Sequence, residues 1–280
     1  PPRSTLFPYT TLFRSPAKFI GFDKIAPMVF DFMVELKNNY ISRKFMGDYG
    51  FTLNEFLEGT YTKNGRSFEI KDKDVIRDLT SLMTWKTKQA EVSPVFLNAF
   101  VLTGYDEENG LGIYHYEVRD QFYWHKVQTC YIAEGSGRQS VDPMMYGFAE
   151  NLLIKDRRGN VDRVSGLMAL LYGVVTAMDH EIGVGGYPSI TLIDGRQPVY
   201  RDRLREVSDD RAHLAAQIVR ATFRHYLPYR EGYALMDELM YQGGSFEAVY
   251  DKLFEKVRNP RGFVRMLRGY KIMPHQEDIA

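Results

Sequence analysis

Apolar side chains spaced three or four residues apart predict that much of the chain is helical. The first such stripe runs over residues 22–40 and is typical of an amphipathic helix. A second helix is expected over residues 72–86, with Asp72 or Asp74 placed to cap its start. The same spacing predicts further helices over residues 141–154 and 164–178 and, in several pieces, over residues 208–280.

Three segments between these helices are rich in β-branched and aromatic residues, which favours strands. They are expected to form an antiparallel meander, because short turn-forming sequences separate them. These segments cover residues 95–106, 111–118 and 122–135. We expect the two helices that follow to pack on this sheet. A second pair of strands is expected over residues 189–194 and 197–201, joined by a turn at Asp194-Gly195.

The order of these elements predicts an α+β fold in which helices cover a mainly antiparallel sheet. Residues 16–207 are expected to form this domain, and residues 208–280 to form a helical extension added to it. Residues 47–67 contain the turn signal Asn64-Gly65, and we interpret them as a surface connection between two helices.

The composition excludes several classes of function. Equal numbers of basic and acidic residues, 36 of each, give a formal net charge of zero without a dense run of Lys or Arg, so we expect no nucleic-acid partner. The longest apolar stretch, residues 167–178, is shorter than the roughly 18 residues that span a bilayer, so we expect no membrane partner. Cys130 is the only cysteine, which excludes an intrachain disulfide and fits a reducing, cytoplasmic location.

Neither a metal nor a cofactor is expected. The six histidines show no ligand spacing such as HExxH. The glycines within residues 183–186 precede a predicted strand, whereas the glycine-rich loop of a dinucleotide site follows one. Ser136 is not a lipase-type nucleophile, because Glu134 and Arg138 stand where the G-x-S-x-G motif requires glycine.

The start of the chain has an unusual sequence. Residues 5–15 read TLFPYTTLFRS, which is the translation, in one reading frame, of a widely used short-read sequencing adapter. We therefore interpret residues 1–15 as adapter-derived and set them aside from the fold. We expect them to make few native contacts, and we expect the native N-terminus to have preceded Pro16.

Three short motifs follow one another in the middle of the chain: FLNAFVLTGYDEENG, YIAEGSGRQSV and AMDHEIGVGGYPSITLID. In their order and spacing they resemble the second half of the proteasome-type N-terminal-nucleophile hydrolases, over residues 73–194. This resemblance implies a layered αββα sandwich, in which two antiparallel sheets lie between helix layers. It also implies a nucleophile that is an N-terminal threonine, whose own amine serves as the base. We expect that residue to be lost with the native N-terminus.

The resemblance also implies three candidate site residues. Ser136, between two glycines, matches a serine that supports the nucleophile by hydrogen bonding. The family's D-x-x-S-G turn is altered here, because Val184 stands in the serine position and Glu181 in the position of the acid, with Asp179 two residues earlier. We expect the Gly135–Gly137 turn and the turn at residues 183–186 to approach each other at one end of the sheet.

These features predict a fragment of a proteasome-like threonine-type peptidase or amidohydrolase subunit, whose parent acts on peptide or protein substrates. The altered turn leaves a noncatalytic assembly subunit of the same fold as an alternative, and an unrelated α+β binding module as another. Subunits of this kind commonly expose apolar helix faces, so we expect a homo-oligomer.

Overall fold

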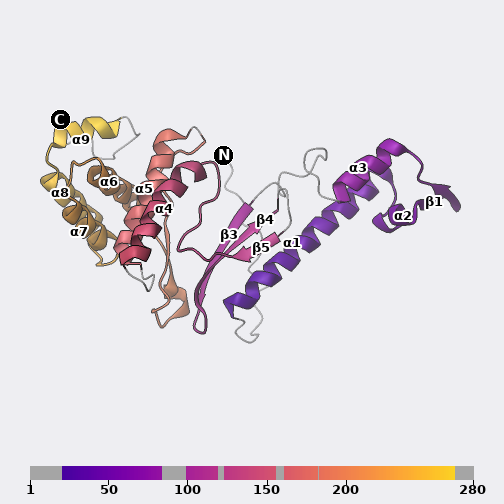
Figure 1. The fold of residues 1–280 in the computed structure, drawn as a ribbon, viewed down its shortest axis with the longest axis horizontal. Helices are drawn as coiled ribbons and strands as arrows, with labels where there is room; N and C mark the ends of the chain where they lie inside the picture. The colour runs from indigo at the N-terminus through magenta and orange to yellow at the C-terminus, as the bar shows by residue number, and fades with distance from the viewer. Residues whose placement is uncertain (1–20, 84–98, 119–122, 156–160, 182, 269–280) are drawn as a thin grey trace. The chain divides into compact units, whose positions relative to one another are not determined.

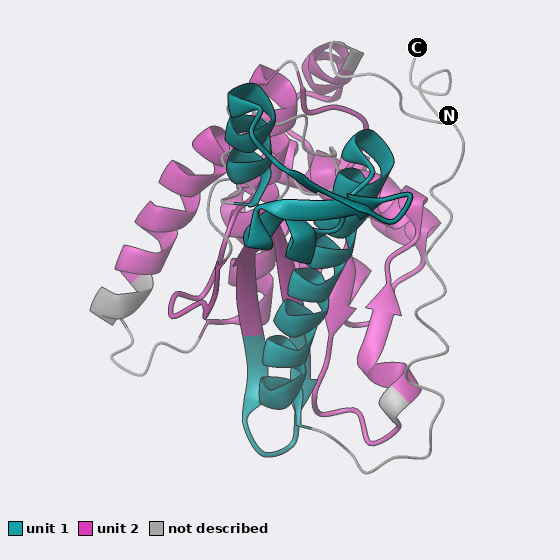
Figure 2. Cartoon of the chain, turned by 90° about the vertical axis from the view of Figure 1, so that its right-hand side faces the viewer, with its two compact units in different colours: residues 1–92, 103–112 teal, residues 93–102, 113–280 magenta. Residues whose placement is uncertain are grey.

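The computed structural model describes residues 21–83, 99–118, 123–155, 161–181 and 183–268 (Figure 1). Residues 1–15, which we interpreted as adapter-derived, lie outside the described residues, so their expected lack of native contacts stays a prediction. The chain divides into two compact units (Figure 2). One contains residues 1–92 and 103–112, and the other contains residues 93–102 and 113–280.

The first unit begins with the predicted amphipathic helix. Helix α1 covers Phe22–Lys44 and continues into a π-helical turn over Phe45–Tyr49. Helix α3 covers Lys73–Met83, and Asp72 caps it as expected: its Oδ1 accepts from the backbone N–H groups of Asp74, at 2.9 Å, and Val75, at 3.1 Å.

The segment expected to be a surface connection is itself folded, so that prediction was wrong. It contains helix α2 (Leu53–Glu58) and a hairpin of strands β1 (Thr60–Lys63) and β2 (Arg66–Glu69). Asn64 and Gly65 both have positive φ, 53° and 74°, which is the requirement of a two-residue hairpin turn. Aromatic rings hold the segment together, and the Phe45 ring meets those of Phe51 and Phe56 edge-on.

The predicted meander is present as three neighbouring strands. Strand β3 (Ala99–Asp106) lies beside β4 (Gly110–Glu117), which pairs antiparallel with β5 (Tyr123–Lys126). The third strand was expected to continue to Gly135, but it ends at Lys126. One more backbone bond, from Val127 N–H to the Ile113 carbonyl at 2.8 Å, follows before the chain leaves the ladder.

The remaining elements belong to the second unit. Two long helices come first, α4 (Arg138–Lys155) and α5 (Arg163–His180), and a short strand pair follows, β6 (Thr191–Ile193) with β7 (Leu204–Glu206). Four more helices complete the described chain: α6 (Asp209–Phe223), α7 (Tyr229–Met240), α8 (Phe246–Lys256) and α9 (Pro260–Arg268). The partner of β6 was expected at residues 197–201, where the chain instead makes turns before β7 begins.

Helix α5 is buried on two faces. Met168, Leu171 and Val175 belong to a core that it shares with α6, α7 and α8. On the opposite face, small residues at Ala169, Gly173 and Ala177 recur every four positions and bring α4 close. A Cβ atom on Gly173 would lie 3.1 Å from Val141 Cγ1 of α4, which is tight packing.

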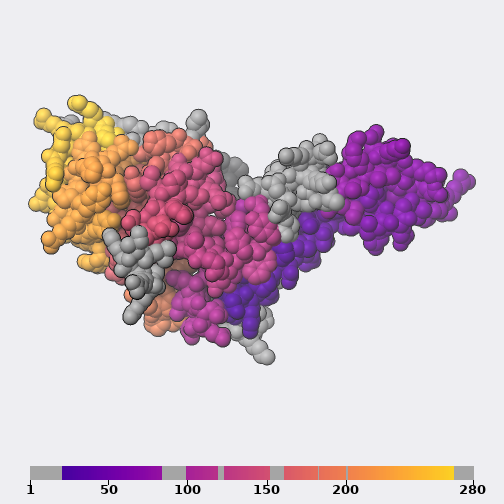
Figure 3. Space-filling model, in the orientation of Figure 1, coloured from indigo at the N-terminus to yellow at the C-terminus, as the bar shows by residue number. Residues whose placement is uncertain are grey.

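This packing corrects one expectation. The buried side chains of α4 and α5 in these two clusters meet each other and the C-terminal helices, and the expected packing of α4 and α5 on the meander stays a prediction. Residues 208–280 were expected to be an added extension, whereas α6, α7 and α8 share one core with α5. The reason is that α5 has apolar residues on most of its circumference and can cover two neighbours. Figure 3 shows the orange surface of these helices next to that of the preceding elements.

The mixed helix-and-sheet class is confirmed, with antiparallel pairing in the three small sheets of the described residues. The four-layered sandwich stays a prediction. No helix among the described residues combines the length and the apolar character needed to cross a bilayer.

Gly232, in the first turn of α7, lies against α6. A Cβ atom at this position would be 2.0 Å from Thr222 Oγ1, which itself donates to the Ile218 carbonyl at 2.6 Å. We expect Gly232→Ala to lower the free energy of unfolding by about 1–3 kcal/mol, measured by urea denaturation. Gly147→Ala is the matched control, because nothing lies within 4 Å of its Cβ position on α4. The control should be neutral or slightly stabilising.

If the contact with Thr222 is the cause, Thr222→Ala should relieve part of the loss in the Gly232→Ala background. Equal stability of the Gly232→Ala and Gly147→Ala variants would contradict the packing described here.

The imidazole of His213 on α6 is half-buried and stacks on the Tyr187 ring at 6.2 Å. Burial, and then the charge of Arg220, hold the pKa of His213 below 6.5, although Asp210 opposes this. A depressed imidazole pKa means that the unfolded chain binds the proton more readily, so stability falls as the pH drops below about 6.5.

We expect His213→Gln to flatten this part of the stability curve, measured by thermal unfolding between about pH 8 and pH 5. His180→Gln, at the exposed C-terminal end of α5, is the control and should leave the His213 contribution in place. An unchanged pH dependence in the His213→Gln variant would rule out this source of acid sensitivity.

Candidate functional site

Ser136 lies at the exposed tip of a tight turn before α4. Gly135 has φ 104°, a conformation that disfavours any residue with a Cβ atom. The turn is held by backbone bonds: Arg138 N–H donates to the Gly135 carbonyl at 3.2 Å, and Ser140 N–H donates to the Gly137 carbonyl at 3.1 Å. Helix α4 therefore begins directly behind the Ser136 side chain.

A second turn follows the C-terminal end of α5. Glu181 N–H still donates to the Ala177 carbonyl at 2.8 Å, and Val184 N–H then donates to the Glu181 carbonyl at 3.1 Å. The chain continues through Gly185 and Gly186 towards β6. This places Glu181 at the point where the α5 helix stops.

The two turns approach each other, as expected, between the start of α4 and the end of α5. Their expected place at one end of the sheet stays a prediction. A Cβ atom on Gly183 would lie 3.3 Å from Ser136 Oγ, and one on Gly137 would lie 3.1 Å from Val184 Cγ2. Ser140 Oγ donates a hydrogen bond to Glu181 Oε1 at 2.6 Å, which joins α4 to the end of α5. We call this arrangement of residues 135–140 and 181–184 the Ser136 corner.

Asp179 lies outside the Ser136 corner. Its side chain is buried, with 4% exposed, and its two oxygens pair with Arg220 Nη2 at 2.9 Å and Arg224 Nη2 at 3.0 Å. Arg220 belongs to α6 and Arg224 is the C-cap residue of that helix, so this candidate site residue is used to join α5 to α6.

The Ser136 corner offers a hydroxyl group and a carboxylate, but not an activated nucleophile. Within the described ranges, no imidazole or amine is hydrogen-bonded to Ser136 Oγ, so nothing there lowers the cost of deprotonating it. The same residues contain no group of three His, Cys, Asp or Glu side chains placed to hold a metal ion. The hydroxyl and the carboxylate of the corner can orient a reacting group that another part of the protein supplies.

Next to the corner lies a chain of polar and charged side chains that the sequence analysis missed. His115 Nε2 of β4 lies 2.7 Å from Glu134 Oε1, and Arg138 Nη1 lies 3.4 Å from the same oxygen. Arg138 Nε then pairs with Asp142 Oδ2 at 3.0 Å. The four-residue spacing of Glu134, Arg138 and Asp142 was visible in the sequence, but the contact with His115 depends on how β4 meets the turn.

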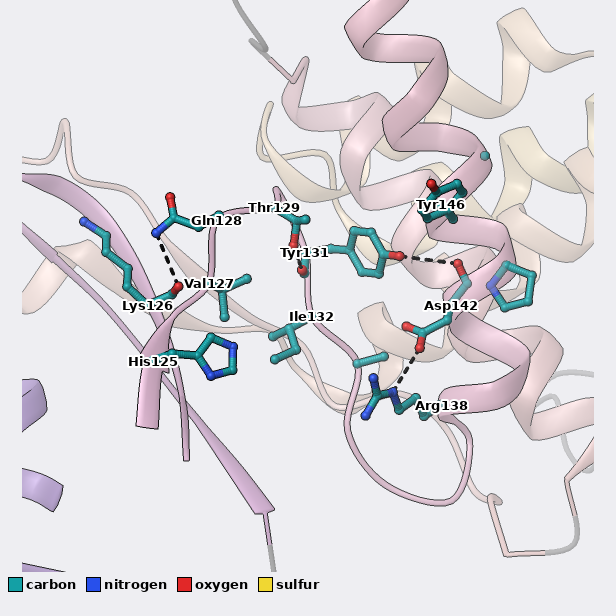
Figure 4. Close-up of a pocket in the computed structure, with 13 residues that line it drawn as sticks. His125, Lys126, Val127, Gln128, Thr129, Tyr131, Ile132, Arg138, Asp142 and Tyr146 are labelled. Carbon is teal, nitrogen blue, oxygen red and sulfur yellow. Dashed lines mark hydrogen bonds and ion pairs between the residues drawn. The ribbon is translucent and has the colours of Figure 1, made fainter. Parts of the chain in front are cut away.

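An open hollow of about 820 Å³ lies between the end of β5 and α4 (Figure 4). The Tyr131 side chain points across it, and its hydroxyl donates to the Asp142 carbonyl at 3.5 Å. Burial is the main cause that raises the Tyr131 pKa, so this hydroxyl stays protonated near neutral pH. Arg138 lines the hollow and also begins the helix behind Ser136, so the hollow and the corner share a wall.

The chain matches no family model, no curated protein and no solved structure.

The ion pair of Asp179 gives a test of its structural role. We expect Asp179→Asn to lower the free energy of unfolding by about 3–5 kcal/mol, because it removes the negative charge of the buried ion pair with Arg220. Asp194→Asn is the control, since Asp194 pairs with the exposed Arg196 and should cost at most about 1 kcal/mol. Urea denaturation of both variants provides the comparison, and equal losses would show that the Asp179 pair contributes no more than a surface pair.

Proposed function

We propose that the Ser136 corner is the supporting half of an N-terminal-nucleophile site in a proteasome-like, threonine-type peptidase subunit. The observation that carries the proposal is the approach of two glycine-containing turns that are distant in sequence, with Ser136 Oγ close to Gly183. The resemblance of three short motifs also predicts this approach. The substrate class that we propose is a peptide or protein amide bond.

The chemistry assigns a separate role to each part of the site. A hydroxyl group at its ordinary pKa is a weak nucleophile, so an N-terminal threonine uses its own α-amine to take the proton as the oxygen attacks the carbonyl carbon. In this proposal, the Ser136 hydroxyl orients that amine by hydrogen bonding. The carboxylate of Glu181, fixed by Ser140, favours the protonated amine that forms during attack. In this proposal, the nucleophile is the first residue of the mature chain.

One observation favours the second candidate, a noncatalytic assembly subunit. Val184 stands where the resembled family has a serine, and its Cγ2 atom packs towards Gly137. The corner therefore has an apolar contact where a further hydroxyl is expected. A subunit that only assembles with its partners could carry this change without loss of function.

We also propose that the subunit associates with copies of itself in the cytoplasm. Two large apolar side chains of α4, Met144 and Tyr146, are 36% and 65% exposed, and in this proposal another copy of the chain covers them. The single cysteine, Cys130, is free and exposed, which suits a reducing compartment.

The proposal is tested on the intact gene. Mass spectrometry of the mature protein should identify Thr, Ser or Cys as the first residue, and the protein should cleave fluorogenic peptides. We expect Ser136→Ala to lower kcat by about 10- to 100-fold with little change in KM, because the hydroxyl acts on the nucleophile and not on substrate binding. Ser67→Ala, on the exposed strand β2, should leave both constants unchanged.

Two results would decide against the enzyme. A mature protein without a terminal nucleophile would support the assembly subunit, and an unchanged kcat in the Ser136→Ala variant would remove Ser136 from the site. The chain from Pro16 to Ala280 should stay at background in the same assay, because Pro16 has no side-chain nucleophile.

A further inference from the structure

We infer that His115 is a positioning residue for the turn that carries Ser136, acting through Glu134. The inference rests on the proposed function for the use of this turn, although the contact itself can be tested without it. His115 belongs to β4 in the meander, and Glu134 stands two residues before Ser136. The contact between them joins the sheet to the Ser136 corner.

The geometry places the Glu134 carboxylate beside nitrogen atoms of two side chains, His115 and Arg138. The Glu134 side chain is 15% exposed, and its Oε1 atom lies 2.7 Å from Nε2 of the buried His115. This atom pair is at ion-pair distance without the alignment of a hydrogen bond. The other partner, Arg138, is 54% exposed and more distant, at 3.4 Å. A carboxylate removed from water requires such partners, so His115 is the one that holds Glu134 inward.

The sheet holds His115 firmly in place. Its backbone is in register with His125 of β5, and the two imidazole rings meet edge-on at 5.2 Å. The Tyr123 ring adds a further edge contact at 6.5 Å. Loss of the imidazole would therefore leave β4 in place while releasing Glu134.

On the N-terminal side of the turn, Tyr131 and Ala133 pack against the α4–α5 core, and Glu134 follows them directly before Gly135. Gly135 and Gly137 carry no side chains, and the backbone bonds of the turn all lie on its helical side. Glu134 is thus the last side chain anchored before the flexible Gly135, whose φ is 104°. Release of Glu134 allows Ser136 to move away from Gly183.

Amide hydrogen exchange on the full chain tests directly whether the contact between His115 and Glu134 holds the turn in place. The reporters are the backbone N–H groups of Arg138, Ser140 and Val141, which donate to the Gly135 and Gly137 carbonyls. We expect these amides to exchange about 10- to 100-fold faster in His115→Phe, which keeps a ring but removes the nitrogen. His115→Gln retains a donor for Glu134 and should stay within about threefold of the wild-type rates.

His125→Phe is the matched control, because it removes an imidazole from the neighbouring strand without touching Glu134, and its reporter rates should also stay within about threefold. Amides in the core of α6 and α7 show whether a variant unfolds globally. Unchanged reporter rates in His115→Phe would overturn the inference, and so would equal acceleration of reporters and core amides. If His115→Phe does not fold, Glu134→Gln gives the same test from the other side of the contact.

Activity of the mature enzyme separates this inference from the proposed function. With both correct, His115→Phe lowers kcat with little change in KM, and His115→Gln restores most of it. A parent protein without any peptidase activity would refute the proposed function. The exchange experiment would still show whether the contact between His115 and Glu134 holds the turn. A looser turn with unchanged kcat would refute the positioning role of His115.

Discussion

The close approach of α4 to α5 is the constraint on which the second unit depends. It is possible because Ala169, Gly173 and Ala177 form a row without bulky side chains, against which Val141 packs. The same row ends at the Ser136 corner, since a Cβ atom on Gly137 would lie 2.9 Å from the Cβ atom of Ala177. A larger side chain anywhere in this row would move the start of α4, and the turn before it, away from the end of α5.

The opposite face of α5 explains why the corner can be held in place. Large apolar side chains on this face join the core shared with α6, α7 and α8. Asp179, near the C-terminal end of α5, adds its ion pairs with Arg220 and Arg224. Helix α5 is thus fixed by its bulky face and open to approach on its small face. A side chain that resembles a catalytic acid in sequence contributes to this rigidity, while Glu181, one half-turn later, faces the corner.

Local signals were predictable from the sequence, and contacts between distant segments were not. The Asn64-Gly65 turn and the Asp72 cap were found because each depends on a few neighbouring residues. The end of β5 was missed because apolar residues continue through Ile132, although the backbone leaves the ladder after Val127. The approach of the two turns was predicted only through a resemblance between motifs. The partnership of His115 with Glu134 had no signal, because 19 positions and a change of direction separate them.

The shared core of α5 to α8 also has a consequence for synthesis on the ribosome. The meander and α4 leave the ribosomal exit tunnel before α6, α7 and α8 have been translated. At that stage the bulky face of α5 has no partner, although the N-terminal half of the unit is already outside the ribosome. Because α5 to α8 contact their neighbours in sequence, their assembly closes only short loops and is rapid once the last helix emerges. The nascent chain therefore exposes an apolar α5 surface for the time needed to translate the residues of α6 to α8, and this is the interval in which a chaperone would bind it.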